Sequence, residues 1–129
     1  MNESVKTVLI IEDEEHQREA LRASFDQQQC RVMTATNGKE GLEKIKEARP
    51  NIILLDLMMP VLDGFAFLDA LKRDEEFKHI PVVILTNLGT QERLTDLIND
   101  KCAYFFTKTN SSLKEIVDKT KEMCLKGNC

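Results

Sequence analysis

Long hydrophobic runs and an excess of positive charge are both absent from this sequence of 129 residues. No apolar run approaches the roughly 20 residues that a membrane-spanning helix requires, and the polar residues 1–6 do not resemble a signal peptide. We therefore expect no membrane segment and a cytoplasmic protein. The formal net charge of −4 disfavours direct binding to nucleic acid, because Lys and Arg supply most of the affinity for a phosphate backbone.

Paired cysteine motifs are also absent. None of the four cysteines belongs to a C-x-x-C pair, and neither histidine stands at metal-ligand spacing from a cysteine, which disfavours a zinc site. This usage is typical of a protein that keeps its thiols reduced. Cys124 and Cys129 are close in sequence and could crosslink on oxidation, more as an artefact of purification than as a redox switch.

Short apolar runs alternate with helical patterns along the whole chain, and no linker or low-complexity tract interrupts them. This alternation predicts an α/β fold and one domain over residues 1–129, with a doubly wound, flavodoxin-like parallel sheet of five strands in the order 2-1-3-4-5. The expected strands are 6–12, 31–35, 52–55, 82–85 and 103–106, and the expected helices are about 14–28, 38–48, 65–73, 91–100 and 113 onward.

Local signals mark the ends and buried faces of these helices. Asn37 with Glu40, and Ser112 with Glu115, have the spacing of N-terminal caps. The residues expected to face the core are Ala20, Leu21, Ser24 and Phe25 in the first helix, Leu94, Leu97 and Ile98 in the fourth, and Leu113, Ile116, Val117, Thr120 and Met123 in the last.

Four of the apolar runs end on residues suited to phosphate or metal chemistry. These residues are Glu12 and Asp13 after the first run, Asp56 after 52–55, Thr86 after 82–85 and Lys108 after 104–106. Parallel strands place their carboxyl ends along one edge, so the five side chains are expected to converge there. Three neighbouring carboxylates repel one another unless a cation neutralises them, and magnesium (Mg²⁺) prefers such oxygen ligands. The pattern predicts a Mg²⁺ site able to take a phosphoryl group.

Each of these residues also has a separate explanation. The acids of 12–15 complement a helix dipole, Asp56 can cap a turn, Thr86 suits a strand and Lys108 suits a solvated surface. Their joint occurrence at the ends of four different strands favours one shared site.

Four motifs resemble those of response-regulator receiver domains of two-component signalling, and the resemblance covers nearly the whole chain. The motifs are LIIEDE at 9–14, LLDLMMP at 54–60 followed by Asp63 and Gly64, ILT at 84–86 and FFTK at 105–108. The resemblance implies a phosphorylation-dependent signalling protein rather than an enzyme. Because few residues follow the last expected helix, we expect a stand-alone receiver with no output domain.

The resemblance also implies a role for each site residue. Asp56 would be the phosphoacceptor, with Lys108 pairing with the phosphoryl oxygens and Thr86 bonding one of them. Mg²⁺ would be held by Asp13, by Asp56, by Glu12 as an outer or water-mediated ligand, and by the backbone carbonyl of Met58. Thr86 and Phe105 would form the switch that alters the face of helix 4, strand 5 and helix 5.

The partners implied by the resemblance are proteins. A sensor histidine kinase or a histidine phosphotransfer protein would supply the phosphoryl group, and a downstream protein effector would read it. No direct contact with nucleic acid or membrane is implied. The expected state is a monomer or a weak phosphorylation-dependent dimer.

Several positions depart from the family pattern. Thr109 replaces the proline usual after the lysine, Asn87 replaces a small residue, and Lys101-Cys102 replaces Gly-Ala. Asn87 is expected to crowd the phosphorus and slow phosphorylation by small donors. Met58 and Leu88 are apolar and cannot orient a hydrolytic water, which predicts a long-lived phosphorylated state.

Two alternatives belong to other classes. A pseudo-receiver that binds proteins without being phosphorylated would also carry the substitutions at positions 87 and 109, although the retained acids, Thr86 and Lys108 disfavour it. A haloacid-dehalogenase-type phosphatase is disfavoured because Met58 stands where that family has a second acid.

Overall fold

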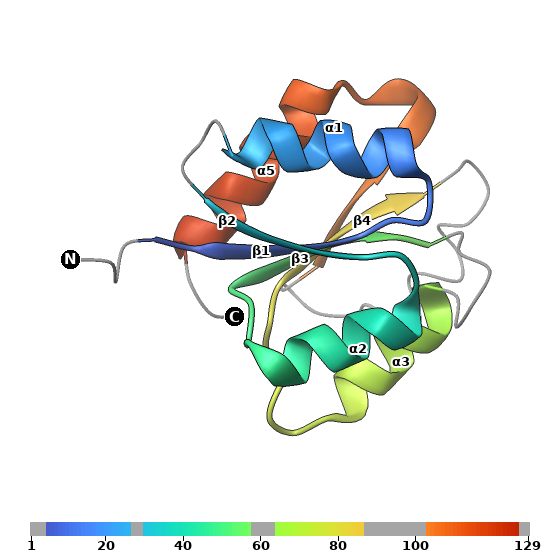
Figure 1. The fold of residues 1–129 in the computed structure, drawn as a ribbon, viewed down its shortest axis with the longest axis vertical. Coiled ribbons are helices and arrows are strands. Elements are labelled where there is room, and N and C mark those ends of the chain that lie inside the picture. The colour runs from blue at the N-terminus through green and yellow to red at the C-terminus, as the bar shows by residue number, and fades with distance from the viewer. Residues whose placement is uncertain (1–4, 27–29, 58–63, 87–102, 127–129) are drawn as a thin grey trace.

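The computed structural model describes residues 5–26, 30–57, 64–86 and 103–126, which form a parallel sheet covered by helices (Figure 1). The strands are β1 (Thr7–Ile11), β2 (Arg31–Ala35), β3 (Ile52–Asp56), β4 (Val82–Thr86) and β5 (Ala103–Thr107). The described helices are α1 (Glu15–Asp26), α2 (Gly38–Glu47), α3 (Gly64–Arg73), α5 (Leu113–Lys126) and the short 3₁₀ helix η2 (Lys108–Asn110). The sheet order is β2-β1-β3-β4-β5, so the predicted α/β class and strand order are confirmed. The predicted helix at 91–100 lies outside the described residues.

The sheet separates two hydrophobic layers, with α1 and α5 on one face and α2 and α3 on the other (Figure 1). Side chains of successive residues in β1 pack into opposite hydrophobic layers. Val8 and Ile10 join the cluster that includes residues of α1 and α5, whereas Leu9 and Ile11 join the cluster that includes residues of α2 and α3. A strand buried on both faces needs an unbroken apolar run, which explains why β1, β3 and β4 lack polar alternation.

Among the described residues, no helix has both the length and the apolar character needed to cross a bilayer.

The predicted inner faces of α1 and α5 are correct in outline and wrong at two positions. The predicted face of the 91–100 helix lies outside the described residues. Leu21 and Phe25 of α1 are buried, but Ala20 is exposed and supplies its carbonyl to the Ser24 hydroxyl at 2.9 Å. In α5, Leu113 is 42% exposed. The other predicted residues of α5 lie on its inner face: Ile116, Val117 and Thr120 are buried, and Met123 is partly buried. The inner face also includes the buried Cys124, which was not predicted from the helical pattern.

Both predicted caps are confirmed. The Asn37 side chain accepts a hydrogen bond from the backbone N–H of Glu40 at 2.8 Å, which satisfies one of the free donors at the start of α2. At the start of α5 the bonds are reciprocal: Ser112 Oγ accepts from the N–H of Glu115 at 3.1 Å, and Glu115 Oε1 accepts from the N–H of Ser112 at 2.7 Å. The second cap therefore defines where α5 begins, close after η2.

Candidate metal-binding and phosphate site

Three carboxylates meet at the carboxyl ends of β1 and β3. The register pairs Ile11 with Leu55, so the next residues along the two strands, Glu12 and Asp56, are neighbours. Oxygens of Glu12, Asp13 and Asp56 all lie within 4.8 Å of one another. Glu12 and Asp56 are buried, whereas Asp13 is exposed, so the cluster opens to solvent on the Asp13 side. The predicted convergence of these acids is confirmed.

Glu12 is buried, and its two carboxylate oxygens differ in their hydrogen bonding. Its Oε2 accepts a hydrogen bond from the N–H of Glu14 at 3.1 Å, but its buried Oε1 has no hydrogen-bond partner within the part of the chain that the structure describes. Burial, followed by the hydrogen bond and negative charge of Asp56, raises the pKa of Glu12 from 4.5 to about 8, against the lowering effects of the Glu14 N–H and of Lys108.

Lys108 forms ion pairs with two of these acids. Its Nζ lies 3.2 Å from Asp56 Oδ2 and 3.9 Å from Glu12 Oε1. One ammonium opposite three carboxylates leaves an excess of negative charge when all are ionised. A buried carboxylate oxygen that accepts no hydrogen bond from the described residues, beside two further carboxylates, is suited to a hard divalent cation. Ligands at about 2.1 Å from an octahedral ion lie up to about 4.2 Å apart, which is close to the 4.8 Å limit within which the three oxygens lie. The three acids therefore could hold such an ion.

Thr86 and Phe105 lie on the same face of the sheet. Asp56 pairs with Leu85 in the register, which places the buried Thr86 one residue beyond the acid along β4. Phe105 of β5 pairs with Ile84, two residues before Thr86. Because side chains alternate along a strand, Ile84, Thr86 and Phe105 share one face. Phe105 is 41% exposed, so it has not packed into the core on that face.

A family model of the response regulator receiver domain matches residues 8–121. The chain belongs to the response-regulator receiver family. The receiver is 39% identical to the transcriptional regulatory protein AfsQ1 of Streptomyces coelicolor over 80 residues, which make up 62% of this chain and 34% of that protein. It is 34% identical over 92 residues to the polar-differentiation response regulator DivK of Brucella anthropi, covering 69% of this chain and 75% of that protein.

Solved structures agree with this assignment. The receiver domain of the Francisella response regulator 1452 aligns with a TM-score of 0.82 at 25% identity, covering 94% of this chain and 98% of that one. The receiver thus spans about a third of AfsQ1 but nearly all of the Francisella domain. This protein is a two-component response-regulator receiver, and the fold expected from the sequence is that of its relatives.

Some residues singled out in the sequence cannot be placed. Met58, Asn87, Leu88 and the pair at 101–102 lie outside the described residues. Thr109 belongs to the backbone of η2, which begins at Lys108 itself. The chain therefore turns directly after the lysine without the proline that is usual in the family.

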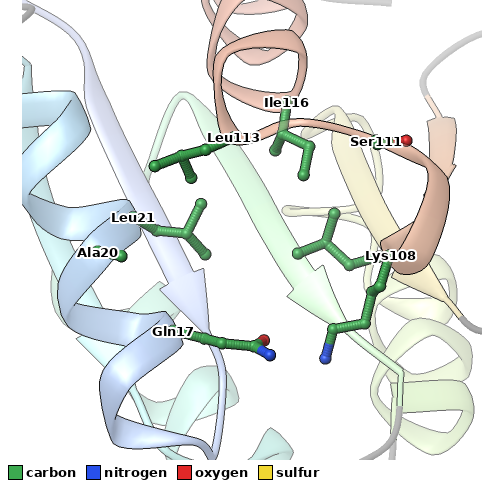
Figure 2. A pocket seen from close by; sticks show the side chains of 8 residues that line it. Gln17, Ala20, Leu21, Lys108, Ser111, Leu113 and Ile116 are labelled. Atoms are coloured by element: carbon green, nitrogen blue, oxygen red, sulfur yellow. The ribbon is translucent and has the colours of Figure 1, made fainter.

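A recess beside Lys108 was not anticipated from the sequence. It has a volume of about 260 Å³ and lies between α1 and the start of α5 (Figure 2). Figure 2 shows Leu21, Leu113 and Ile116 around one end of the recess, and Gln17 and Lys108 facing each other at the other. Its lining explains the exposure of Leu113, which borders this recess instead of the core.

Sequence reasoning also missed Arg18 of α1. Its Nη1 donates to the backbone carbonyl of Glu12 at 3.1 Å and lies 3.4 Å from the carbonyl of Asp13. The side chain thus contacts the backbone from which two of the three acids project. The only signal available was an arginine one helical turn after the acids, which by itself resembles any exposed basic residue of a helix.

Proposed function

We propose that this receiver takes a phosphoryl group onto Asp56 from a phosphohistidine or a small phosphodonor, and that the modified domain signals to a protein partner. The observation that carries the proposal is the convergence of Asp56 with Glu12, Asp13 and Lys108 at one edge of the sheet. Membership of the receiver family supports the same function.

The acids provide the ligands for Mg²⁺. Asp13 and Asp56 would hold the ion directly, Glu12 would reach it directly or through water, and the backbone carbonyl of Met58 would add a further ligand. The ion, when bound, neutralises the carboxylates and the oxygens of an incoming phosphoryl group. The buried Oε1 of Glu12 supports this assignment. It accepts no hydrogen bond from the described residues, with the Lys108 ammonium 3.9 Å away, and a buried carboxylate oxygen without a hydrogen bond is costly.

Asp56 is the nucleophile in the proposed transfer. One of its carboxylate oxygens forms a bond to phosphorus while the bond from phosphorus to the donor's imidazole nitrogen breaks. The imidazole, which carries a proton on its other ring nitrogen, leaves with that electron pair and is neutral histidine after the transfer. Lys108, which contacts Asp56 Oδ2 before transfer, then pairs with a phosphoryl oxygen and offsets the added negative charge.

Thr86 and Phe105 would convert acceptance into a signal. A phosphoryl group on Asp56 adds strong hydrogen-bond acceptors beside the end of β4, where Thr86 is buried. If the Thr86 hydroxyl turns toward them, it leaves room on the face that it shares with Phe105. Phe105 would then move inward from its exposed position. This movement would change the surface formed by β5, α5 and the helix predicted at 91–100.

The proposed partners follow from this chemistry. A sensor histidine kinase or a histidine phosphotransfer protein would be the donor, and a downstream effector protein would recognise the altered face. We propose a monomer, or a weak dimer formed through that face after phosphorylation.

The test is incubation of the protein with Mg²⁺ and phosphoramidate or acetyl phosphate, followed by intact-mass measurement. We expect the mass of one added phosphoryl group in the wild type, none in Asp56→Asn, and an unchanged product in Asp69→Asn, whose carboxylate is exposed and pairs with Arg73 in α3. A wild-type protein that gains no phosphoryl group from either donor would reject the proposal in favour of a phosphorylation-independent binding module.

A further inference from the structure

The corner between β1 and α1 is held by hydrogen bonds from several directions. The N–H of Glu12 donates to the carbonyl of Ala35 at 3.0 Å, and the N–H of Glu14 donates to Glu12 Oε2 at 3.1 Å. Arg18 completes the set from α1, through its bond to the Glu12 carbonyl and its longer contact with the Asp13 carbonyl. Two consecutive carbonyls of the corner are thus engaged by one guanidinium nitrogen.

The burial pattern of α1 supports a specific role for this arginine. Side chains at 15–17 and at 19 and 20 are exposed, whereas Arg18 is partly buried. A long cationic side chain on a helix surface normally extends into water. Here the Arg18 side chain lies against the backbone of Glu12 and Asp13 instead. Holding it in this position costs side-chain conformational entropy.

From this geometry we infer that Arg18 is a positioning residue for the metal site. By bonding the carbonyls of Glu12 and Asp13, it restricts the peptide between them and therefore the directions in which both carboxylates project. This inference rests on the proposed function, because it concerns the same Mg²⁺ site.

Electrostatics alone would give Arg18 the opposite effect. A guanidinium is always charged and repels a nearby divalent cation, so its removal should tighten Mg²⁺ binding if charge were all that mattered. Positioning predicts weaker binding after removal, because a cation must then order a mobile corner on its own. The sign of the change in affinity therefore separates the two roles.

The experiment is calorimetric titration of the full chain with Mg²⁺ alone, in the absence of any phosphodonor. Arg18→Met keeps the aliphatic stem and removes the donors, and we expect its dissociation constant to rise about 10–100-fold, the usual range for residues that orient metal ligands. Arg22→Met is the matched control, since Arg22 lies on the same helix, is half exposed and lies 3.9 Å from the exposed Glu19, a residue outside the metal site. Its affinity for Mg²⁺ should equal that of the wild type.

A second variant keeps the inference testable if Arg18→Met fails to fold. Arg18→Lys retains the charge but lacks the planar fork and the full reach of the guanidinium, so it should bind Mg²⁺ more weakly than the wild type at equal charge. Thermal unfolding in EDTA establishes that each variant is folded at the titration temperature. Weaker binding in a folded variant supports positioning.

Two results would overturn the inference in distinguishable ways. Equal or tighter binding in Arg18→Met, with a wild type that does bind Mg²⁺, refutes the positioning role and leaves the proposed function intact. A wild type that binds no Mg²⁺ refutes the metal site of the proposed function together with this inference.

Discussion

The ammonium nitrogen of Lys108 lies 3.2 Å from Oδ2 of Asp56, although 52 residues separate them in the sequence. The Asp56 side chain is 2% exposed and that of Lys108 is 22% exposed, so the pair is largely shielded from solvent. A shielded, charge-assisted hydrogen bond is stronger than an ion pair in water. The contact links the end of β3 to the start of η2, and any group added to Asp56 must rearrange it.

We predict that Lys108→Met lowers the rate of phosphorylation by phosphoramidate about 100-fold, the usual loss when one preorganised donor to a developing anion is removed. The rate is measured by intact mass over time at saturating Mg²⁺. Lys114→Met is the control, because Lys114 is exposed and pairs with Asp118 on the same helix. Equal rates for Lys108→Met and the wild type would show that Lys108 does not contact the transferred group.

The raised pKa of Glu12 predicts a pH-dependent stability in the absence of metal. The folded protein holds the Glu12 proton up to a pKa of about 8, whereas the unfolded chain releases it near 4.5. The stabilisation from this group is therefore complete below pH 4.5 and is lost as the pH rises to about 8. We expect the free energy of unfolding in EDTA to fall over this range by an amount on the order of a few kcal/mol, measured by urea titration at several pH values.

Glu12→Gln isolates this contribution because it cannot titrate. The difference between wild type and variant should vary with pH between about 4.5 and 8 and should be constant above that window. Added Mg²⁺ should stabilise the wild type more at pH 8 than at pH 6, since the cation competes with the proton for the same carboxylates. Parallel pH profiles for wild type and variant would contradict the raised pKa.

Close packing of α2 on β1 predicts a cost for Gly41→Ala. A Cβ atom at position 41 would lie 2.5 Å from Ile11 Cδ1 and 3.2 Å from Phe67 Cε1, so the core must shift to admit it. We expect a loss of about 1–3 kcal/mol in the free energy of unfolding, despite the better helix propensity of alanine. Chemical denaturation measures it. Glu43→Ala, at an exposed position of α2, should change stability by far less.

The residue after Thr86 predicts a kinetic difference. Asn87 is larger than the small residue usual at this position in the family, and we expect Asn87→Ala to be phosphorylated faster by small donors than the wild type. The measurement is the initial rate with acetyl phosphate and Mg²⁺. A variant rate equal to or below that of the wild type would show that Asn87 does not obstruct the phosphorus.

The lifetime of the phosphorylated state is also predicted. Met58 and Leu88 are apolar and cannot hold a hydrolytic water by hydrogen bonds, so dephosphorylation in the presence of Mg²⁺ should be slow. Decay of the phosphorylated mass after removal of the donor reports it. A half-life of only seconds in the purified protein would contradict the prediction that apolar residues at positions 58 and 88 slow dephosphorylation.

The strands, their order and the meeting of the acids with Lys108 could be predicted from local sequence patterns. Unbroken apolar runs such as 52–55 require burial on both faces, and a parallel sheet with right-handed crossovers admits few strand orders. Once the sheet is parallel, residues at the strand ends share one edge. The convergence of Glu12, Asp56 and Lys108 follows from that topology.

How these residues interact depends on contacts between segments that are distant in the sequence. The pKa of Glu12 depends first on its burial and then on the distant residues Asp56 and Lys108, and no local pattern encodes these contacts. Leu113 belongs to the apolar stripe of α5, but it borders a recess that residues of α1 also line. Its exposure therefore depends on where α1 lies relative to α5. Arg18 reads as a surface residue in the sequence and bonds the Glu12 carbonyl in the fold. Short-range periodicity sets which face a residue occupies, whereas contacts between distant segments set what it touches.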